Sequence, residues 1–170
     1  QETVVKKYLE TTLGYGYKQA PNSHNVEIRN FITKDGVTYI VDGKSVTFDI
    51  SNKEFKIAAW LERKFGGSLF LLPKVNYPKG IQTADYLFRD EYWDLKEITG
   101  NSKHTIDSNI KAKKKQACNF IIDITNSEMM MDEAIKQIKT IYTNQKRNWV
   151  EKIILKKGDF TKVYVKEKTD

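Results

Sequence analysis

The stretch "TADYLFRDEYWDLKEITG", residues 83–100, carries Asp85 in its first aromatic-rich run and Asp94 and Lys96 in its second. Side chains alternate between the two faces of a strand, so Asp94 and Lys96 share one face. A two-residue turn between the two strand-like runs would place Asp85 opposite Asp94, whereas a shift of one residue would send Asp85 to the other face. Facing carboxylates repel unless a cation lies between them, and carboxylate oxygens suit Mg²⁺ or Mn²⁺. The geometry leaves two interpretations open, a metal site and a solvated charged face.

A third carboxylate, Glu54, lies in the helix predicted for residues 51–67. It shares one helical stripe with three apolar residues at i+4, i+7 and i+11, so its side chain is expected at the edge of the core-facing side. There it could join Asp85 and Asp94 as a third metal ligand. The competing interpretation is a capping box in "SNKE", in which Glu54 reaches back to the backbone of Ser51.

A lysine-rich helix predicted over 105–117 carries a polar stripe beside an apolar one. Such a stripe could line a substrate groove, and the lysines around it could position phosphates. A solvated lysine face explains Lys111, Lys114 and Lys115 equally well. The candidate substrate-binding residues are Lys103, Thr105, Asn109, Lys113 and Gln116.

The predicted elements after residue 50 follow the order α-β-β-β-α-β-α-β-β, which is typical of an α/β (α+β) sandwich with a mixed sheet. The first fifty residues predict a short amphipathic helix that ends at Gly14, then a loop, then a hairpin turning at Asp42–Gly43. We therefore expect an extension over 1–50 and a core over 51–170.

The composition narrows the classes of function. The 170 residues carry a net charge of +7, which favours an acidic partner such as nucleic acid. One cysteine excludes an intramolecular disulfide framework, and two distant histidines make a histidine metal site improbable. No apolar run approaches the length of a membrane span. Because the chain starts at Gln1, we expect it to be a domain of a longer protein.

The order of these motifs resembles the PD-(D/E)xK nuclease superfamily: a helical Glu54, then Asp85, then "DLK" at 94–96. More narrowly, residues 51–125 resemble the tRNA nuclease toxin domains at the C-termini of contact-dependent inhibition proteins of the CdiA type, and similar modules of phage proteins of the MuF kind. The superfamily's proline before the first aspartate is Ala84 here. The motifs that carry the resemblance are "LLP" at 71–73, "KGIQTADYLF" at 79–88, "YWDLKEITG" at 92–100, "TIDSNI" at 105–110 and "QACNFIIDI" at 116–124.

The resemblance implies a restriction-endonuclease-like mixed sheet flanked by helices, and a phosphodiesterase that uses Mg²⁺, or Mn²⁺ or Zn²⁺. Asp85 and Asp94 would hold the metal with help from Glu54, and Lys96 would stabilise charge or position water. The polar stripe of the 105–117 helix would face the site.

The resemblance also implies tRNA as substrate and a cognate acidic immunity protein as partner. It implies delivery from a larger secreted or phage-borne protein, and action in the cytoplasm of the target cell. Two other functions remain open from the residues alone: a DNase of the same fold, and a non-catalytic nucleic-acid-binding phage or structural module.

Overall fold

The computed structural model describes residues 7–12, 17–22, 25–114 and 116–167. The chain forms two compact units. Unit 1 comprises residues 1–18, 95–114 and 118–170, and unit 2 comprises residues 19–94 and 115–117. Strand β9 (Glu91–Glu97) is continuous through the boundary, so its N-terminal part belongs to unit 2 and its C-terminal part to unit 1.

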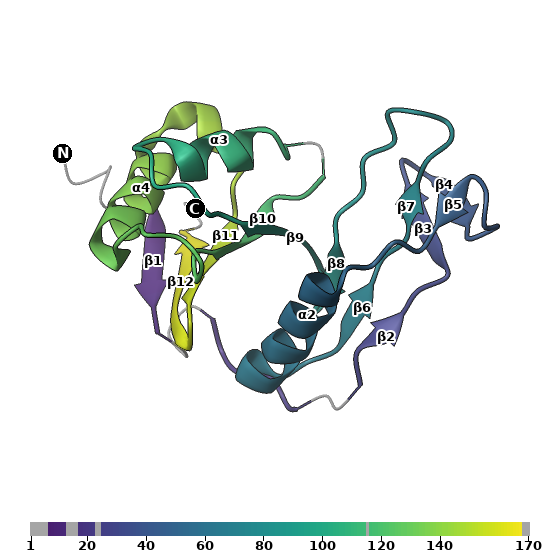
Figure 1. Cartoon of the computed structure of the whole chain (residues 1–170), viewed down its shortest axis with the longest axis horizontal. Coiled ribbons are helices and arrows are strands. Elements are labelled where there is room, and N and C mark those ends of the chain that lie inside the picture. Colours follow the sequence, from purple (N-terminus) through teal and green to yellow (C-terminus); the bar gives the residue numbers. More distant parts are fainter. Residues whose placement is uncertain (1–6, 13–16, 23–24, 115, 168–170) are drawn as a thin grey trace. The chain divides into compact units, whose positions relative to one another are not determined.

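Unit 1 is built on one sheet with the strand order β1-β12-β11-β10-β9 (Figure 1). Strands β10 and β11 are parallel, and β12 pairs antiparallel with both β11 and β1. The elements of unit 1 besides β9 are β1 (Tyr8–Thr11), α3 (Thr105–Lys111), β10 (Asn119–Asp123), α4 (Met131–Thr143), the 3₁₀ helix η1 (Gln145–Arg147), β11 (Lys152–Lys157) and β12 (Phe160–Lys166).

The core of unit 1 lies between this sheet and helices α3 and α4. Helix α4 contributes Ala134, Ile138 and Ile141, at the i, i+4, i+7 spacing of one buried helical face. Strand β10 is buried along its whole length, as its continuous run "NFIID" indicates for a parallel strand covered on both faces.

Unit 2 contains the strand order β9-β8-β6-β2 and two small two-stranded sheets, β3–β4 and β5–β7. Strand β8 pairs antiparallel with β6 and β9, and β2 runs parallel to β6. The elements of unit 2 besides β9 are β2 (Glu27–Ile28), β3 (Phe31–Lys34), β4 (Val37–Ile40), β5 (Val46–Thr47), α2 (Asn52–Phe65), β6 (Leu69–Leu71), β7 (Lys74–Val75) and β8 (Tyr86–Phe88).

The predicted fold class is confirmed: the described residues form a mixed α+β structure with a large mixed sheet and three α-helices. The order of elements after residue 50 also agrees with the prediction, apart from the two-residue strand β7 and the short η1. Helix α3 ends at Lys111, earlier than residue 117. Within the described residues, no helix combines the length and apolar character that crossing a membrane requires.

Two predictions for the first fifty residues are wrong. The stretch predicted as an amphipathic helix contains strand β1, because Tyr8–Thr11 pair with Val163–Lys166 of β12 and this pairing overrides the local helical pattern. Part of that stretch lies outside the described residues. The hairpin is β3–β4 and turns at Asp35–Gly36, where both residues have positive φ.

The predicted turn residue Asp42 instead shapes a loop. Its Oδ1 accepts hydrogen bonds from the backbone N–H groups of Val46, Lys44 and Ser45. These bonds lower the pKa of Asp42 to about 2. Strand β5, which follows the loop, pairs with β7 rather than with β4.

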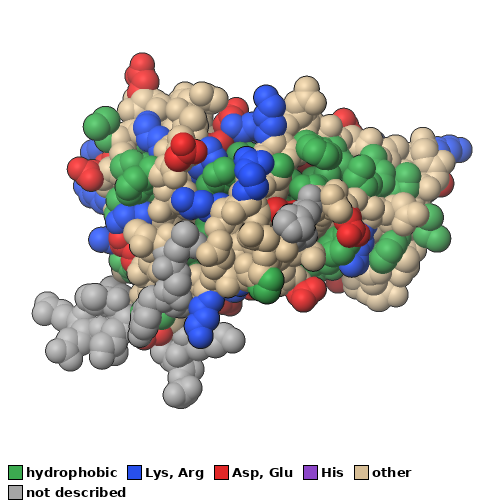
Figure 2. Space-filling view, turned by 90° about the horizontal axis from the view of Figure 1, so that it is seen from below, with side chains coloured by type: hydrophobic (Ala, Val, Ile, Leu, Met, Phe, Trp, Pro, Cys, Tyr) green, Lys and Arg blue, Asp and Glu red, His purple; other side chains and the backbone are tan. Residues whose placement is uncertain are grey.

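Unit 2 exposes large hydrophobic side chains on β2, β3 and β4. Figure 2 shows hydrophobic side chains gathered over this unit on the face seen there. Apolar surface of this kind is common where proteins bind other macromolecules. The exposed side chains on these strands are Ile28, Phe31, Val37 and Ile40.

Candidate active site

The hairpin of β8 and β9 has the register on which the carboxylate prediction depends. Phe88 pairs with Glu91 and Tyr86 pairs with Trp93. Arg89 and Asp90 form the two-residue turn with φ of 53° and 64°, a conformation that matches the twist of a hairpin. The tight turn was therefore predicted correctly.

Asp85 and Asp94 follow next, just beyond the Tyr86–Trp93 pair. Asp94 is buried in β9, with 2% of its surface exposed, whereas Asp85 is half-buried at the start of β8. The backbone of Asp85 is held from both sides: its N–H donates to the carbonyl of Trp93 at 3.1 Å, and its carbonyl accepts from the N–H of Leu72 at 3.1 Å. Both aspartates are thus fixed by the sheet of unit 2.

Tyr86 links strand β8 to helix α2. Its side chain is fully buried, and its hydroxyl donates a hydrogen bond to the backbone oxygen of Glu54 at 2.6 Å. Burial raises the pKa of Tyr86 far above its usual range, and the negative charges of Asp85, Glu54 and Asp94 raise it further. The three predicted carboxylates therefore act on one buried hydroxyl, which remains protonated.

Glu54 forms the capping box at the start of α2. The backbone N–H of Glu54 donates to Ser51 Oγ at 3.1 Å, and Glu54 Oε1 accepts from the N–H and the hydroxyl of Ser51 at 3.5 and 3.1 Å. Within the described residues, Glu54 Oε2 makes no hydrogen bond. One carboxylate oxygen thus caps the helix while the other stays available.

Gln116 is the member of the polar stripe that belongs to unit 2. It lies in a turn after α3 has ended, and its Oε1 is buried with no hydrogen-bond partner among the described residues. An amide oxygen buried in this way costs about 1–3 kcal/mol unless a donor reaches it. A ligand with a hydrogen-bond donor, or a water molecule, would relieve that cost.

The remaining predicted residues belong to unit 1. Lys96 is half-buried and follows Asp94 by two positions in β9, which places the two side chains on the same face of that strand. In α3, Asn109 Nδ2 donates to the backbone oxygen of Thr105 at 2.7 Å, so the helix itself uses this amide. Lys113 lies in a turn beyond α3, and Lys103 is exposed before it.

The sequence does not indicate two residues that the structure brings to attention, Tyr86 and Glu62. Tyr86 gave no chemical signal because an aromatic residue in a strand is ordinarily part of the core. Glu62 in α2 is only 3% exposed, and its Oε1 has no hydrogen-bond partner in the described part of the chain. Its spacing of one helical turn after the buried Ala58 was the available signal.

The donor set fits a hard divalent cation. Magnesium is commonly bound through one or two carboxylates, with water and substrate phosphate oxygens completing the shell. Asp85 and Asp94 can supply such ligands. Among the residues that the structure describes, no three or more His, Cys, Asp or Glu are grouped closely enough to hold a metal by themselves. The oxygen chemistry thus favours Mg²⁺ or Mn²⁺ over Zn²⁺, which prefers nitrogen and sulfur ligands.

The chain is similar to known proteins in part of its sequence and in its fold. Residues 82–160, just under half of the chain, match the family model described as the contact-dependent growth inhibition CdiA C-terminal domain. This match contains Asp85, Asp94 and Lys96. No curated protein sequence matches the chain.

A solved structure is similar to a large part of the chain. It is described as the CdiA-CT/CdiI toxin and immunity complex from Burkholderia pseudomallei. One of its chains superimposes with a TM-score of 0.52 and 21% sequence identity, covering 67% of this chain and 82% of that chain. At this identity the likeness establishes a shared fold.

Proposed function

We propose that this chain is a toxin domain of the contact-dependent inhibition type that cleaves RNA, with tRNA as its substrate, and that it needs a divalent cation. The observation that carries the proposal is the β8–β9 hairpin, whose register places Asp85 and Asp94 just beyond the Tyr86–Trp93 pair, with Lys96 two positions further along β9. The matching family model over 82–160 supports the toxin class. The resemblance of the sequence to the PD-(D/E)xK nucleases, in the order Glu54, Asp85, Asp94 and Lys96, supports the nuclease activity.

The chemistry of the site follows from its charges. A divalent cation held by Asp85 and Asp94 would neutralise charge at the scissile phosphate and lower the pKa of a bound water molecule. Lys96, in the role that the resemblance implies, would stabilise the charge that develops on the phosphate. Glu54 adds negative charge through Oε2, which strengthens cation binding without interrupting the helix cap.

Substrate binding is assigned to the basic segment around α3. Lys103 and Lys113 provide positive charge for backbone phosphates, and Thr105, Asn109 and Gln116 provide polar contacts. The net charge of +7 raises the rate of encounter with RNA of any sequence. The choice of tRNA over other RNA rests on the resemblance.

The biological setting completes the proposal. The domain is delivered as part of a larger secreted or phage-borne protein, acts in the cytoplasm of the target cell, and is silenced by a cognate immunity protein in the producing cell. An acidic partner complements the net charge of +7. The similar structure from Burkholderia pseudomallei is itself a complex of toxin and immunity protein.

The test compares purified protein with two variants of one hairpin. Total tRNA and supercoiled plasmid are each incubated with Mg²⁺, Mn²⁺ or Zn²⁺, and with a chelator. Asp94→Asn removes a proposed ligand, whereas Asp90→Asn makes the same chemical change in the exposed turn, where asparagine tolerates the positive φ.

We expect metal-dependent cleavage of tRNA, its loss by several orders of magnitude in Asp94→Asn, and unchanged cleavage in Asp90→Asn. Plasmid cleavage that outpaces tRNA cleavage would replace the ribonuclease with a DNase. Intact tRNA and plasmid with every metal, or undiminished activity in Asp94→Asn, would overturn the nuclease proposal.

A further inference from the structure

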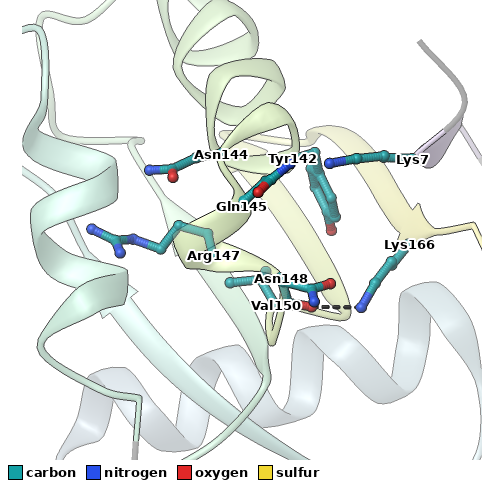
Figure 3. Close-up of a pocket in the computed structure, with 8 residues that line it drawn as sticks. All are labelled: Lys7, Tyr142, Asn144, Gln145, Arg147, Asn148, Val150 and Lys166. Carbon is teal, nitrogen blue, oxygen red and sulfur yellow. Dashed lines mark hydrogen bonds between the residues drawn. The ribbon is translucent and has the colours of Figure 1, made fainter. Parts of the chain in front are cut away.

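A pocket in unit 1 lies where helix α4 gives way to η1. Its volume is about 300 Å³, and its walls come from the segment after α4 and from the neighbouring ends of β1 and β12 (Figure 3). None of its lining side chains is a carboxylate. The pocket is therefore a cationic and amide-lined cavity.

Two lysines reach into this pocket from adjacent strands. Lys166 ends β12 and pairs with Tyr8, and Lys7 directly precedes Tyr8, so the sheet brings both side chains to the same rim. Figure 3 shows both ammonium groups directed toward the segment that follows α4. The convergence is therefore built by the pairing of β1 with β12.

The two lysines differ in their partners within the fold. Lys166 Nζ donates to the backbone oxygen of Asn148 at 2.5 Å and lies 3.9 Å from a carboxylate oxygen of Glu151. Such a lysine satisfies a carbonyl near a helix C-terminus, where positive charge is favourable. Lys7 Nζ, by contrast, has no carboxylate within ion-pair distance among the described residues. The ammonium group of Lys7 is therefore available to bind an anion in the pocket.

The segment after α4 forms the opposite wall of the pocket and carries side-chain amides. The side-chain amides of Gln145 and Asn148 make no hydrogen bond with the described residues. Arg147 holds this segment in place, because its guanidinium points away from the lysines and binds Asp107 of α3 through two hydrogen bonds of 2.7 and 3.0 Å. The amides are thus presented on a segment that is tied to a second helix.

The remaining wall is aromatic and carries no available hydroxyl. The ring of Tyr142 lies 5.1 Å from that of Tyr8, and its hydroxyl donates to the backbone oxygen of Glu151 at 3.1 Å. The pocket therefore offers ammonium and amide N–H donors and no carboxylate, a combination that suits an oxyanion with several acceptor oxygens.

We propose that this pocket binds a phosphate group of the RNA backbone, held by Lys7 and Lys166 with the amides of Gln145 and Asn148. The RNA as source of the phosphate rests on the proposed function, whereas the phosphate chemistry rests on the pocket alone. A contact to backbone phosphate positions the substrate without reading its sequence.

Two measurements distinguish a phosphate of the RNA backbone from free inorganic phosphate as the ligand. Labelled tRNA is titrated with Asp94→Asn protein, which leaves the RNA uncut, over a range of salt concentrations. The comparison adds Lys7→Gln, Lys7→Gln/Lys166→Gln, and the control Lys44→Gln/Lys56→Gln, whose lysines are exposed in unit 2. Inorganic phosphate is titrated separately, with the side-chain amide signals of Gln145 and Asn148 followed by NMR.

We expect the slope of log affinity against log salt to fall by about 0.7–0.9 in the double variant, which loses one phosphate contact, by part of that amount in Lys7→Gln, and to stay unchanged in the control. Phosphate should shift the two amide signals in the parent protein and not in the double variant. Lys7→Gln alone keeps the test valid if loss of Lys166 disturbs folding.

Phosphate shifts with an unchanged RNA slope would overturn the RNA assignment and leave a site for free phosphate. Absence of both effects would overturn the pocket as an anion site. If wild-type protein neither binds nor cleaves RNA while phosphate still shifts the amides, the proposed function fails and the oxyanion pocket stands.

Discussion

The hydrogen bond from Tyr86 to helix α2 gives a sharp test of the structure around the carboxylates. Replacing Tyr86 with phenylalanine keeps the buried ring and removes only the hydroxyl, which donates to the backbone oxygen of Glu54 at 2.6 Å. No charge is lost, so the effect should be one of stability.

The loss of stability in Tyr86→Phe depends on the hydrogen bonds that the backbone carbonyl of Glu54 still accepts. A helical carbonyl at this position also accepts from the N–H four residues later, so it does not become an isolated buried acceptor. The cost is therefore that of one net hydrogen bond, about 1 kcal/mol, rather than the larger penalty for an unsatisfied group. With a urea m-value of about 2 kcal/mol/M, the midpoint should fall by about 0.5 M.

The assay is urea unfolding followed by tryptophan fluorescence, since Trp60 and Trp93 both belong to unit 2. The matched control is Tyr164→Phe, because the buried hydroxyl of Tyr164 has no hydrogen-bond partner in the described residues. The control should be neutral or slightly stabilising. Equal midpoints for wild type and Tyr86→Phe would refute the assigned hydrogen bond.

Two further predictions concern other parts of the structure. Burial raises the pKa of Tyr86 and of Tyr142, so both are neutral in the fold while unfolded tyrosines ionise near pH 10. Their contribution to the unfolding free energy should be complete below about pH 10 and decline above it by about 1.4 kcal/mol per pH unit for each residue. An unfolding free energy that stayed constant from neutral to alkaline pH would contradict this. Gly66 has φ of 72° and a side chain there would clash with the backbone oxygen of Ala20, whereas Gly43 has φ of 76° and open space around it. Gly66→Ala should therefore cost about 3 kcal/mol or more and Gly43→Ala about 1 kcal/mol, and similar thermal midpoints for the two variants would argue against the close approach.

The sequence sufficed where local signals and tertiary structure agree. The helix from Asn52 to Phe65 begins at a capping box and ends at a glycine, and both signals are local. The β8–β9 register follows from a two-residue turn between aromatic runs, and this register buries Tyr86, Phe88 and Trp93.

The sequence failed where distant pairing decides the structure. Strand β1 exists because its backbone pairs with β12, about 150 residues later, and no local pattern carries that information. Tyr86 was overlooked for a related reason: its importance comes from a hydrogen bond to α2, which lies 32 residues earlier. Residue types therefore suffice to nominate candidate site residues, whereas the contacts that support those residues depend on tertiary structure.

Glu54 offers the last and most discriminating prediction, because one substitution separates its two roles. Glutamine preserves the capping box, since its side-chain oxygen still accepts from the backbone of Ser51, but it removes the negative charge. If Oε2 supports cation binding, Glu54→Gln should lower tRNA cleavage by about tenfold or more while the unfolding free energy changes by less than about 0.5 kcal/mol.

The complementary variant is Ser51→Ala, which removes the hydroxyl that accepts from the N–H of Glu54 and leaves the carboxylate in place. It should cost about 1 kcal/mol of stability and leave cleavage within a few-fold of wild type below the unfolding transition. Full activity in Glu54→Gln would show that this carboxylate is a helix cap alone. The proposed cation site would then rest on Asp85 and Asp94, whose positions the β8–β9 hairpin fixes without any help from α2.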